Sequence, residues 1–159
     1  AYLDALRRKL GLATARDDDA DLAEDLLNLM AQNDADFTLT FRHLCDAAAG
    51  PENDVGVRAQ FTDPAAYEGW AVRWRARLAM ETIDRAARQE VMRTVNPAFI
   101  PRNHQVEAVI RAAVDHGDFA PFETLNAVLA RPYEDAPEQS AYAVPPLPEQ
   151  RVTQTFCGT

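Results

Sequence analysis

The sequence predicts an all-α fold, in which about six to seven helices form one domain over residues 1–131 and an extended, proline-rich tail follows over residues 132–159. Apolar residues recur at spacings of three and four along most of the first part, which is the period of a helix that buries one face. Residues that start and stop helices separate these stretches. Five of the ten prolines fall in the final 28 positions and exclude a continuous helix there.

The first two helices are expected on either side of a polar connector, residues 13–20. Residues 2–10 form the first helix, which Gly11 ends. Asp21 and Glu24 have the spacing of a capping box, which predicts the start of the second helix. Its helical stripe consists of four apolar residues, Leu22, Leu26, Leu29 and Met30, followed by Asn33 at the same period.

Thr38 is expected to cap a third helix, which Gly50 and Pro51 end. Its stripe consists of Phe37, Phe41, Leu44, Cys45 and Ala48. Residues 52–62 show no clear period, and we expect a loop there.

Asp63 followed by Pro64 predicts the start of a fourth helix, because proline at the first helical position gives up an amide that has no partner anyway. Its apolar face consists of Tyr67, Trp70, Ala71, Trp74 and Leu78. Arg73, Arg75 and Arg77 point elsewhere and are expected to be solvated or paired. A single helix up to Val95 would be unusually long, so we expect a break at residues 82–84. The second stripe consists of Ile83, Ala87, Val91 and Val95.

Asn96 and Pro97 stop that helix, and a connector over residues 98–102 follows, with Phe99 and Ile100 turned inward. Asn103 is expected to cap the next helix, which Gly117 ends, and Pro121 opens the last one. Their stripes consist of Val106, Val109, Ile110, Ala113 and Val114, and of Phe122, Leu125, Val128 and Leu129.

The charge balance argues against two classes of partner. Sixteen basic and 25 acidic residues give a net charge of -9, which repels nucleic-acid phosphates and anionic membranes. No apolar run approaches the ~20 residues of a bilayer span. With two cysteines, too few for a disulfide framework, we expect a cytoplasmic protein. Since Ala1 rather than methionine comes first, we expect a piece of a longer chain; a processed or tagged full-length protein is the alternative.

No complete catalytic, nucleotide or metal motif is found, so no catalytic, cofactor-binding or metal-binding residue is assigned. Asp17, Asp19 and Asp21 alternate as in a calcium loop, but Leu22 stands where the turn needs glycine and Asn28 where a bidentate glutamate belongs. The three histidines have no partner at zinc spacing. Trp70 and Trp74 could form a stacking platform for bases, but a buried core face fits the negative charge better.

The two cysteines differ in setting. Cys45 lies on an apolar helix face and is expected to be a small buried hydrophobe. Cys157 lies third from the end, where a terminal segment could deliver its thiol to a distant partner. Redox chemistry and a bystander role are both open for Cys157.

The segment Asn96-Pro97-Ala98-Phe99-Ile100-Pro101-Arg102-Asn103 is similar to one in the selenoprotein O family of pseudokinase-like protein adenylyltransferases. Further stretches resemble, in order, the C-terminal third of that family. They are Lys9-Leu10-Gly11-Leu12, residues 21–33, Ala35-Asp36-Phe37-Thr38-Leu39-Thr40-Phe41-Arg42, Gly117-Asp118-Phe119, Ala130-Arg131-Pro132-Tyr133 and Gln154-Thr155-Phe156-Cys157-Gly158-Thr159.

The resemblance implies a parent protein with a kinase-like fold that moves AMP from ATP onto hydroxyl side chains of other proteins, with magnesium or manganese. It implies that the residues serving ATP and metal lie upstream, so this part itself needs no cofactor. Its partners would be the N-terminal kinase-like region of the same protein and, for the parent, the protein substrates.

By the same resemblance, Cys157 matches the position where some members have selenocysteine and many bacterial ones have cysteine. In the family that residue is thought to pair with a cysteine near the activation loop, which gives redox control. Two departures are visible: the chain ends Cys-Gly-Thr rather than Cys-Ser-Ser, and Arg85 follows Asp84 where proline is expected.

The leading hypothesis is therefore a helical C-terminal part that supports the kinase-like lobe and presents Cys157 as a regulatory thiol. One alternative is a free-standing helical interaction module that docks a partner through the face with Trp70 and Trp74 or through the proline-rich tail. Another is a small metal-binding regulator built on residues 17–25.

Overall fold

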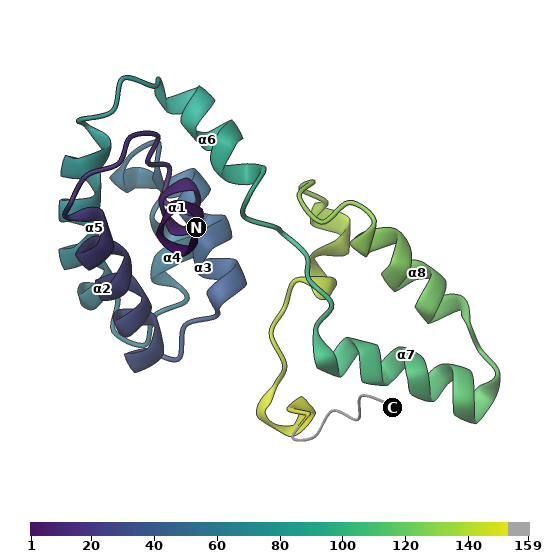
Figure 1. Ribbon diagram of the computed structural model, residues 1–159. Helices are drawn as coiled ribbons and strands as arrows, with labels where there is room; N and C mark the ends of the chain where they lie inside the picture. Colours follow the sequence, from purple (N-terminus) through teal and green to yellow (C-terminus); the bar gives the residue numbers. More distant parts are fainter. Residues whose placement is uncertain (153–159) are drawn as a thin grey trace. The chain divides into compact units, whose positions relative to one another are not determined.

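The protein is described by a computed structural model, and the described residues are 1–152. Within them the chain forms α-helices and short 3-10 helices without any strand, which confirms the all-α class. None of these helices combines the length and the apolarity needed to span a bilayer. Contacts divide the chain into unit 1, residues 1–97, and unit 2, from Ala98 on (Figure 1).

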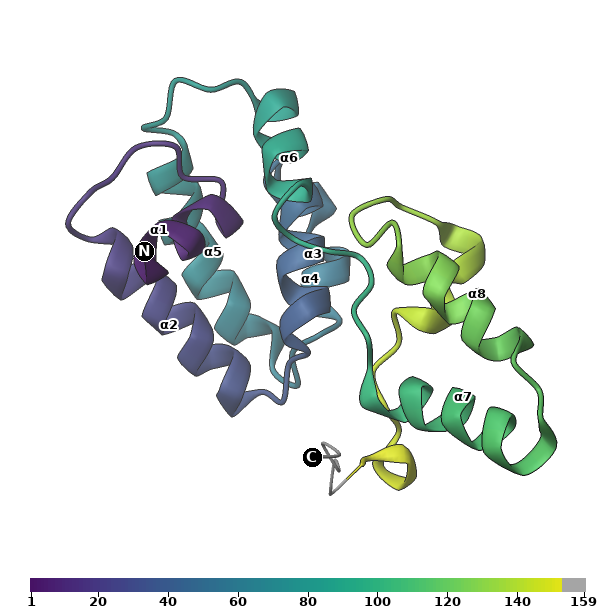
Figure 2. The same ribbon diagram turned by 45° about the vertical axis from the view of Figure 1, so that its right-hand side comes forward.

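Unit 1 contains six α-helices and one 3-10 turn in its described length. They are α1 (Tyr2–Lys9), α2 (Asp19–Gln32), α3 (Phe37–Ala47), η1 (Pro51–Asn53), α4 (Val55–Arg58), α5 (Pro64–Leu78) and α6 (Arg85–Arg93). Helices α2 and α5 run side by side in both ribbon views (Figures 1 and 2).

Two stacked tryptophans of α5 form the centre of the unit 1 core. The ring centroids of Trp70 and Trp74 lie 5.4 Å apart at an interplanar angle of 19°, and both side chains are almost fully buried. The indole N–H of Trp70 donates to the carbonyl oxygen of Leu22, at 2.8 Å, and that of Trp74 to the carbonyl oxygen of Leu10, at 2.9 Å. Each tryptophan thus fills the core and satisfies its one polar atom. The core interpretation is confirmed, and a stacking platform for bases is excluded.

The predicted helix starts are correct for α5 and α6. The Asp63 carboxylate accepts a hydrogen bond from the Ala65 amide, at 3.0 Å, and the Asp84 carboxylate accepts one from Ala87, also at 3.0 Å. The break at residues 82–84 is therefore present, although Arg85 stands where proline was expected.

The predicted starts of α2 and α3 are wrong. Asp36, not Thr38, caps α3, because its carboxylate accepts from the Leu39 amide at 2.8 Å. Helix α2 begins at Asp19, so Asp21 lies inside its first turn.

Residues 52–62 are not the loop that their sequence suggests. They contain the end of η1 and all of α4, whose Val57 is fully buried. Local bonds such as Arg58 N to Asp54 O, at 2.9 Å, satisfy the backbone there. A helix of four residues is too short to show an apolar period, which explains the wrong prediction.

The stripe predicted on α6 is correct only in part, because three of its four residues are half-buried. Val91 is 46% exposed, whereas Arg88 and Met92 are buried. The guanidinium of Arg88 donates to the carbonyl oxygens of Leu78 and Ile83, at 3.0 and 3.3 Å. A buried arginine that finds such acceptors cannot be identified from hydrophobic periodicity.

Unit 2 contains α7 (Asn103–His116), α8 (Ala120–Leu129) and the 3-10 turns η2 (Pro137–Tyr142) and η3 (Pro148–Gln150). Gly117 ends α7 in the left-handed conformation, as predicted, with φ of 64°. Asn103 is the first residue of α7 rather than its cap, which is Arg102. The tail, expected to be extended, forms η2 and η3 within its described part, because prolines can start short helical turns.

The apolar cluster of unit 2 is small. Its buried members are Ala98, Phe99 and Val128, and tail residues including Tyr142 and Ala143 pack against it. The amides of Ala98 and Phe99 both donate to the carbonyl oxygen of Pro132, at 2.7 and 3.1 Å. The start of the tail thus belongs to the same unit as α7 and α8. The boundary that the sequence predicted after residue 131 is where the prolines become frequent, and contacts continue across it.

The stripes predicted for α7 and α8 are half correct. Val109, Leu125 and Val128 are buried, but Ile110, Val114 and Phe122 are 50%, 77% and 52% exposed. The apolar period therefore continues onto a face that the described part of unit 2 does not cover.

Candidate functional site

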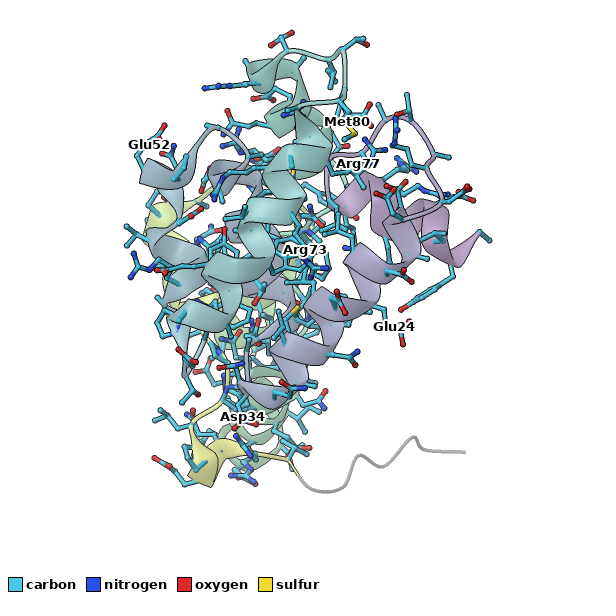
Figure 3. All side chains as sticks on the ribbon, turned by 90° about the vertical axis from the view of Figure 1, so that its left-hand side faces the viewer. Glu24, Asp34, Glu52, Arg73, Arg77 and Met80 are labelled. Carbon is cyan, nitrogen blue, oxygen red and sulfur yellow. The ribbon has the colours of Figure 1, made fainter. Side chains whose placement is uncertain are left out.

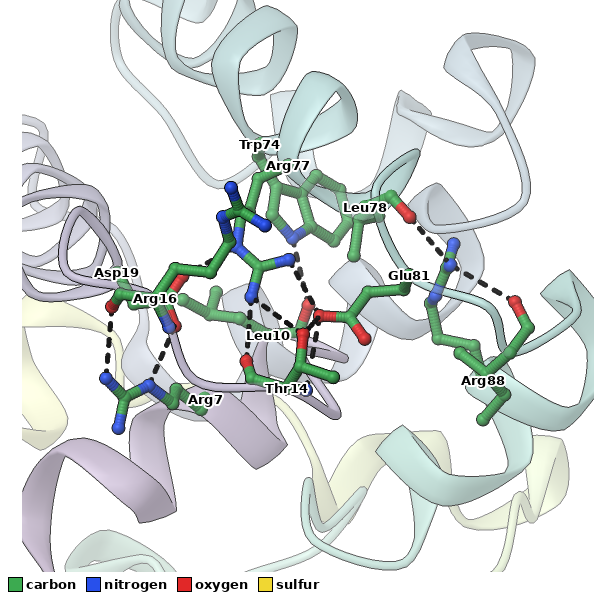
Figure 4. Close-up of polar contacts among 11 residues, drawn as sticks. Arg7, Leu10, Thr14, Arg16, Asp19, Trp74, Arg77, Leu78, Glu81 and Arg88 are labelled. Carbon is green, nitrogen blue, oxygen red and sulfur yellow. Dashed lines mark hydrogen bonds and ion pairs between the residues drawn. The ribbon is translucent and has the colours of Figure 1, made fainter.

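A buried network of ion pairs lies where α1, α2, α5 and the connector before α2 meet (Figure 4). Its members are Arg7, Thr14, Asp19, Arg77 and Glu81. We call it the Asp19–Arg77 network. Two carboxylates and two guanidinium groups meet in it.

Asp19 is fully buried and uses both carboxylate oxygens. Oδ1 accepts from Nε of Arg77 at 2.7 Å, and Oδ2 accepts from Nε of Arg7 at 2.7 Å and from the backbone N–H of Arg16 at 2.9 Å. The carboxylate is thus held by two guanidinium groups and one amide. These bonds tie α1 and α5 to the start of α2.

Glu81 is the second carboxylate of the network. Its Oε1 accepts from Nη1 of Arg77 at 2.7 Å, from the Thr14 hydroxyl at 2.8 Å and from the Thr14 amide at 3.2 Å. Nη2 of Arg77 also donates to the carbonyl oxygen of Thr14 at 2.7 Å. Arg77 therefore joins both carboxylates to the connector.

The protonation of both carboxylates follows from these bonds. Burial alone would raise the pKa of Asp19, but hydrogen bonds from Arg77, the Arg16 amide and Arg7 outweigh it and hold the pKa below its ordinary value. For Glu81, burial is likewise outweighed by Thr14 and Arg77, and its pKa is lowered too. Neither group is suited to act as a general acid or base near neutral pH.

A second buried cluster surrounds Asn96, which is completely buried. Its amide nitrogen donates to the carbonyl oxygen of Lys9 at 2.9 Å, and its amide oxygen accepts from the Lys9 ammonium at 3.2 Å. Nη1 of Arg42 donates to the Asn96 carbonyl oxygen at 2.9 Å. Asn96 thereby fixes the end of unit 1 to α1 and α3, which explains an asparagine at the start of the Asn96-Pro97 segment.

Cys45 lies beside this cluster and is fully buried, as predicted. Its Sγ lies 3.6 Å from the Asn96 amide nitrogen and 3.5 Å from the carbonyl oxygen of Phe41. Burial raises the pKa of the Cys45 thiol, with Asn96 and Arg42 acting in the opposite direction. A buried thiol of raised pKa is a poor nucleophile.

The arginines of α5 are paired, which was one of the two predicted states. Arg73 reaches Asp25 of α2 at 2.7 Å, and Figure 3 shows it on the side of α5 toward that helix. Arg75 pairs with Asp54, whose carboxylate also accepts from the Tyr67 hydroxyl at 2.8 Å. Arg77 is buried and belongs to the Asp19–Arg77 network.

Asp19, the central residue of the metal site considered for residues 17–25, is already bound by arginines. Both Asp19 oxygens are engaged by arginines, so a cation there would have to displace two ion pairs. Among residues 1–152 no group of three or more His, Cys, Asp and Glu side chains is placed to hold a metal ion. The bonds of the network instead join α1, α2, α5 and the connector before α2.

The one site residue that the sequence singled out, Cys157, lies outside the described residues. The Asp19–Arg77 network was missed, because its partners are separated by up to 67 positions. The arginines of α5 predicted pairing without naming the partners, and the spacing of Arg77 and Glu81 by four positions is the local signal that could have named one of them.

Comparison with known proteins shows the family of the chain. The family described as "Protein adenylyltransferase SelO" matches residues 1–130. A protein nucleotidyltransferase YdiU of Bradyrhizobium diazoefficiens is 61% identical over all 159 residues, and its namesake in Rhodopseudomonas palustris is 56% identical over the same length. The chain spans 32% of the length of each. The chain therefore belongs to the SelO family of protein adenylyltransferases.

Proposed function

We propose that this chain is the helical C-terminal part of a cytoplasmic enzyme that transfers AMP from ATP to hydroxyl side chains of other proteins. In this proposal the chain supports a kinase-like region and does not bind ATP itself. The observation that carries it is the family match over residues 1–130 by a chain that spans a third of its relatives.

The ion pairs of the buried carboxylates favour a structural role for this chain. ATP-dependent transfer requires carboxylates that are free to hold magnesium or manganese. In unit 1, Asp19 and Glu81 are bound by arginines, and Asp54 is bound by Arg75 and Tyr67. Carboxylates committed in this way favour a metal site in the remaining two thirds of the protein.

Regulation through Cys157 is the second element of the proposal. Cys45 is the other cysteine of the chain, and its burial and raised pKa make it an unsuitable disulfide partner. A disulfide of Cys157 would therefore use a cysteine from outside residues 1–159.

Two assays test whether the full-length protein transfers AMP and whether this chain alone binds ATP. The full-length protein, incubated with labelled ATP, magnesium or manganese and a lysate, is expected to label proteins with AMP. The chain of residues 1–159 is expected to give no heat of ATP binding in calorimetry at millimolar nucleotide with magnesium. Micromolar ATP binding by the chain alone would contradict the supporting role.

Redox control is tested in the full-length protein with Cys157→Ser. We expect the substitution to abolish an oxidation-dependent shift on non-reducing gels and to make AMP transfer insensitive to oxidant. Cys45→Ser is the matched control and should leave the shift in place. A shift that persists in Cys157→Ser would refute the regulatory role.

An interaction module is the second candidate function. Its version built on Trp70 and Trp74 is excluded, because both rings are buried. The exposed apolar side chains of α7 and α8 favour a version in which unit 2 contacts another protein surface. AMP transfer by the full-length protein separates the two candidates.

A further inference from the structure

Four large apolar side chains stand exposed within residues 110–122, where α7 runs into α8. Ile110 is 50% exposed, Val114 77%, Phe119 59% and Phe122 52%. We call this region the α7–α8 corner. Ile110 and Val114 are one helical turn apart and share a face of α7. Phe119 and Phe122 stand at the start of α8, a helix that contacts α7. The exposed apolar side chains are thus gathered around the connection between two neighbouring helices rather than scattered over the unit.

The core of unit 2 does not use this surface. Buried Val109 lies next to Ile110, which points about 100° away around the helix. On α8 the buried residues are Leu125 and Val128, whereas Phe119 and Phe122 precede them near the helix start. The corner thus continues the apolar pattern on a side that the described part of unit 2 leaves open.

The charges around the corner restrict what can cover it. Residues 107–123 contain four carboxylates, Glu107, Asp115, Asp118 and Glu123, and one arginine, Arg111, a net charge of -3. Arg111 lies 4.0 Å from Glu107, and each of the remaining acidic residues, Asp115, Asp118 and Glu123, is next in sequence to an exposed apolar residue. A second copy would bring acidic flank against acidic flank, and an anionic membrane would be repelled. An apolar surface with a basic rim fits best.

We propose that the α7–α8 corner docks on the part of the same protein that lies outside residues 1–159. This inference rests on the proposed function only in taking the chain as part of a longer protein. The relatives are about three times as long as this chain, and the family match extends through α7 and α8 to residue 130. The docked partner is an apolar, basic-rimmed surface of that remaining part.

The direct test places a photoreactive benzophenone amino acid in the full-length protein, at Val114 or at Phe122. Val72 on α5 is the matched control position, because it is a helical valine with a similar exposure of 69%. After near-ultraviolet irradiation, peptide mapping should find cross-links from positions 114 and 122 to residues outside 1–159 of the same polypeptide, and few from position 72. Cross-links to residues 1–97, to a second copy, or at the yield of the control would overturn the docking.

A paired substitution gives a second readout. Val114→Asp should speed hydrogen exchange of α7 amides in the full-length protein about tenfold, which corresponds to ~1.4 kcal/mol, because it places a charge in the dry interface. Val72→Asp should leave exchange of α5 unchanged. Equal effects would count against docking. AMP transfer is measured separately, so a protein that cross-links as expected but transfers no AMP refutes the proposed function and not the docking.

Discussion

Units 1 and 2 bury apolar surface in very different amounts. In unit 1, twenty buried hydrophobic residues form one cluster, with the stacked Trp70 and Trp74 at its centre. In the described part of unit 2 the corresponding cluster has three, while Ile110, Val114, Phe119 and Phe122 remain exposed. Small units bury a smaller fraction of their surface and are only marginally stable. From this comparison we expect unit 1 to be stable by itself and unit 2 to gain stability from the docking proposed above.

The two units also differ in how they hold charge. Unit 1 buries Asp19 between Arg7 and Arg77, whereas the carboxylates at the α7–α8 corner stand at the surface. Buried ion pairs fix the geometry of a core, and surface charges select partners. In the docking proposed above, the surface carboxylates of unit 2 would help to select the partner, whereas the buried pairs of unit 1 act within the unit.

The largest expected difference between the units comes from truncating one aromatic side chain in each. Trp74→Ala should lower the free energy of unfolding of unit 1 by ~4 kcal/mol, because it opens a cavity and removes the bond to Leu10. In the isolated chain Phe122→Ala should change stability by less than ~0.5 kcal/mol, because the ring is half exposed. Urea denaturation followed by circular dichroism measures both. Equal losses would remove the contrast.

Breaking the Asp19–Arg77 network should have the next largest effect. Asp19→Asn removes the charge that balances two guanidinium groups and should cost unit 1 about 3 kcal/mol at pH 7. Urea midpoints of the variant and the parent chain measure this loss. Glu134→Gln is the control, because Glu134 forms an exposed ion pair with Arg131 in unit 2. Its loss should leave the free energy of unfolding almost unchanged.

The same network predicts a pH dependence for unit 1. Since the folded pKa values of Asp19 and Glu81 lie below their ordinary values, the stabilisation is complete above the unfolded pKa values near ~4 and is lost as pH falls through the folded ones. Acid titration should thus unfold α5 below about pH 4. Asp19→Asn should flatten the slope, and an unchanged slope would assign acid unfolding to other carboxylates.

The smallest predicted difference uses two glycines in the left-handed region. Gly11 in unit 1 has φ of 74°, and an added Cβ would lie 2.7 Å from Sδ of Met92, whereas Gly117 in unit 2 has φ of 64° and nothing within 4 Å. Gly117→Ala should cost only the backbone strain, ~1 kcal/mol, and Gly11→Ala ~2 kcal/mol or more. Thermal melts compare the two, and a larger loss for Gly117→Ala would contradict the packing difference.

The sequence predicted the fold best where side chains follow a regular period. The apolar face of α5, its Asp63 cap and the stop at Gly117 depend on local spacing and were correct. The Asp19–Arg77 network could not be predicted, because a pairing across 58 positions leaves no local pattern. Arg88 was missed for a related reason, since its burial depends on two carbonyl oxygens from α5 and the segment before α6.

The errors in unit 2 have a different cause. Ile110, Val114 and Phe122 follow the helical period, and the period predicts burial without saying against what. When the covering surface lies in another part of the protein, a correct pattern predicts burial that the isolated unit does not show. In the docking proposed above, the exposed stripe marks the surface that the partner covers.

Hydrogen exchange, compared between the chain of residues 1–159 and the full-length protein, tests this account most directly. We predict that the amides of α5 are equally protected in both, and that the amides of α7 and α8 exchange rapidly in the chain alone and slowly in the full-length protein. Equal protection of α7 and α8 in the two proteins would contradict the claim that unit 2 depends on contacts beyond this chain.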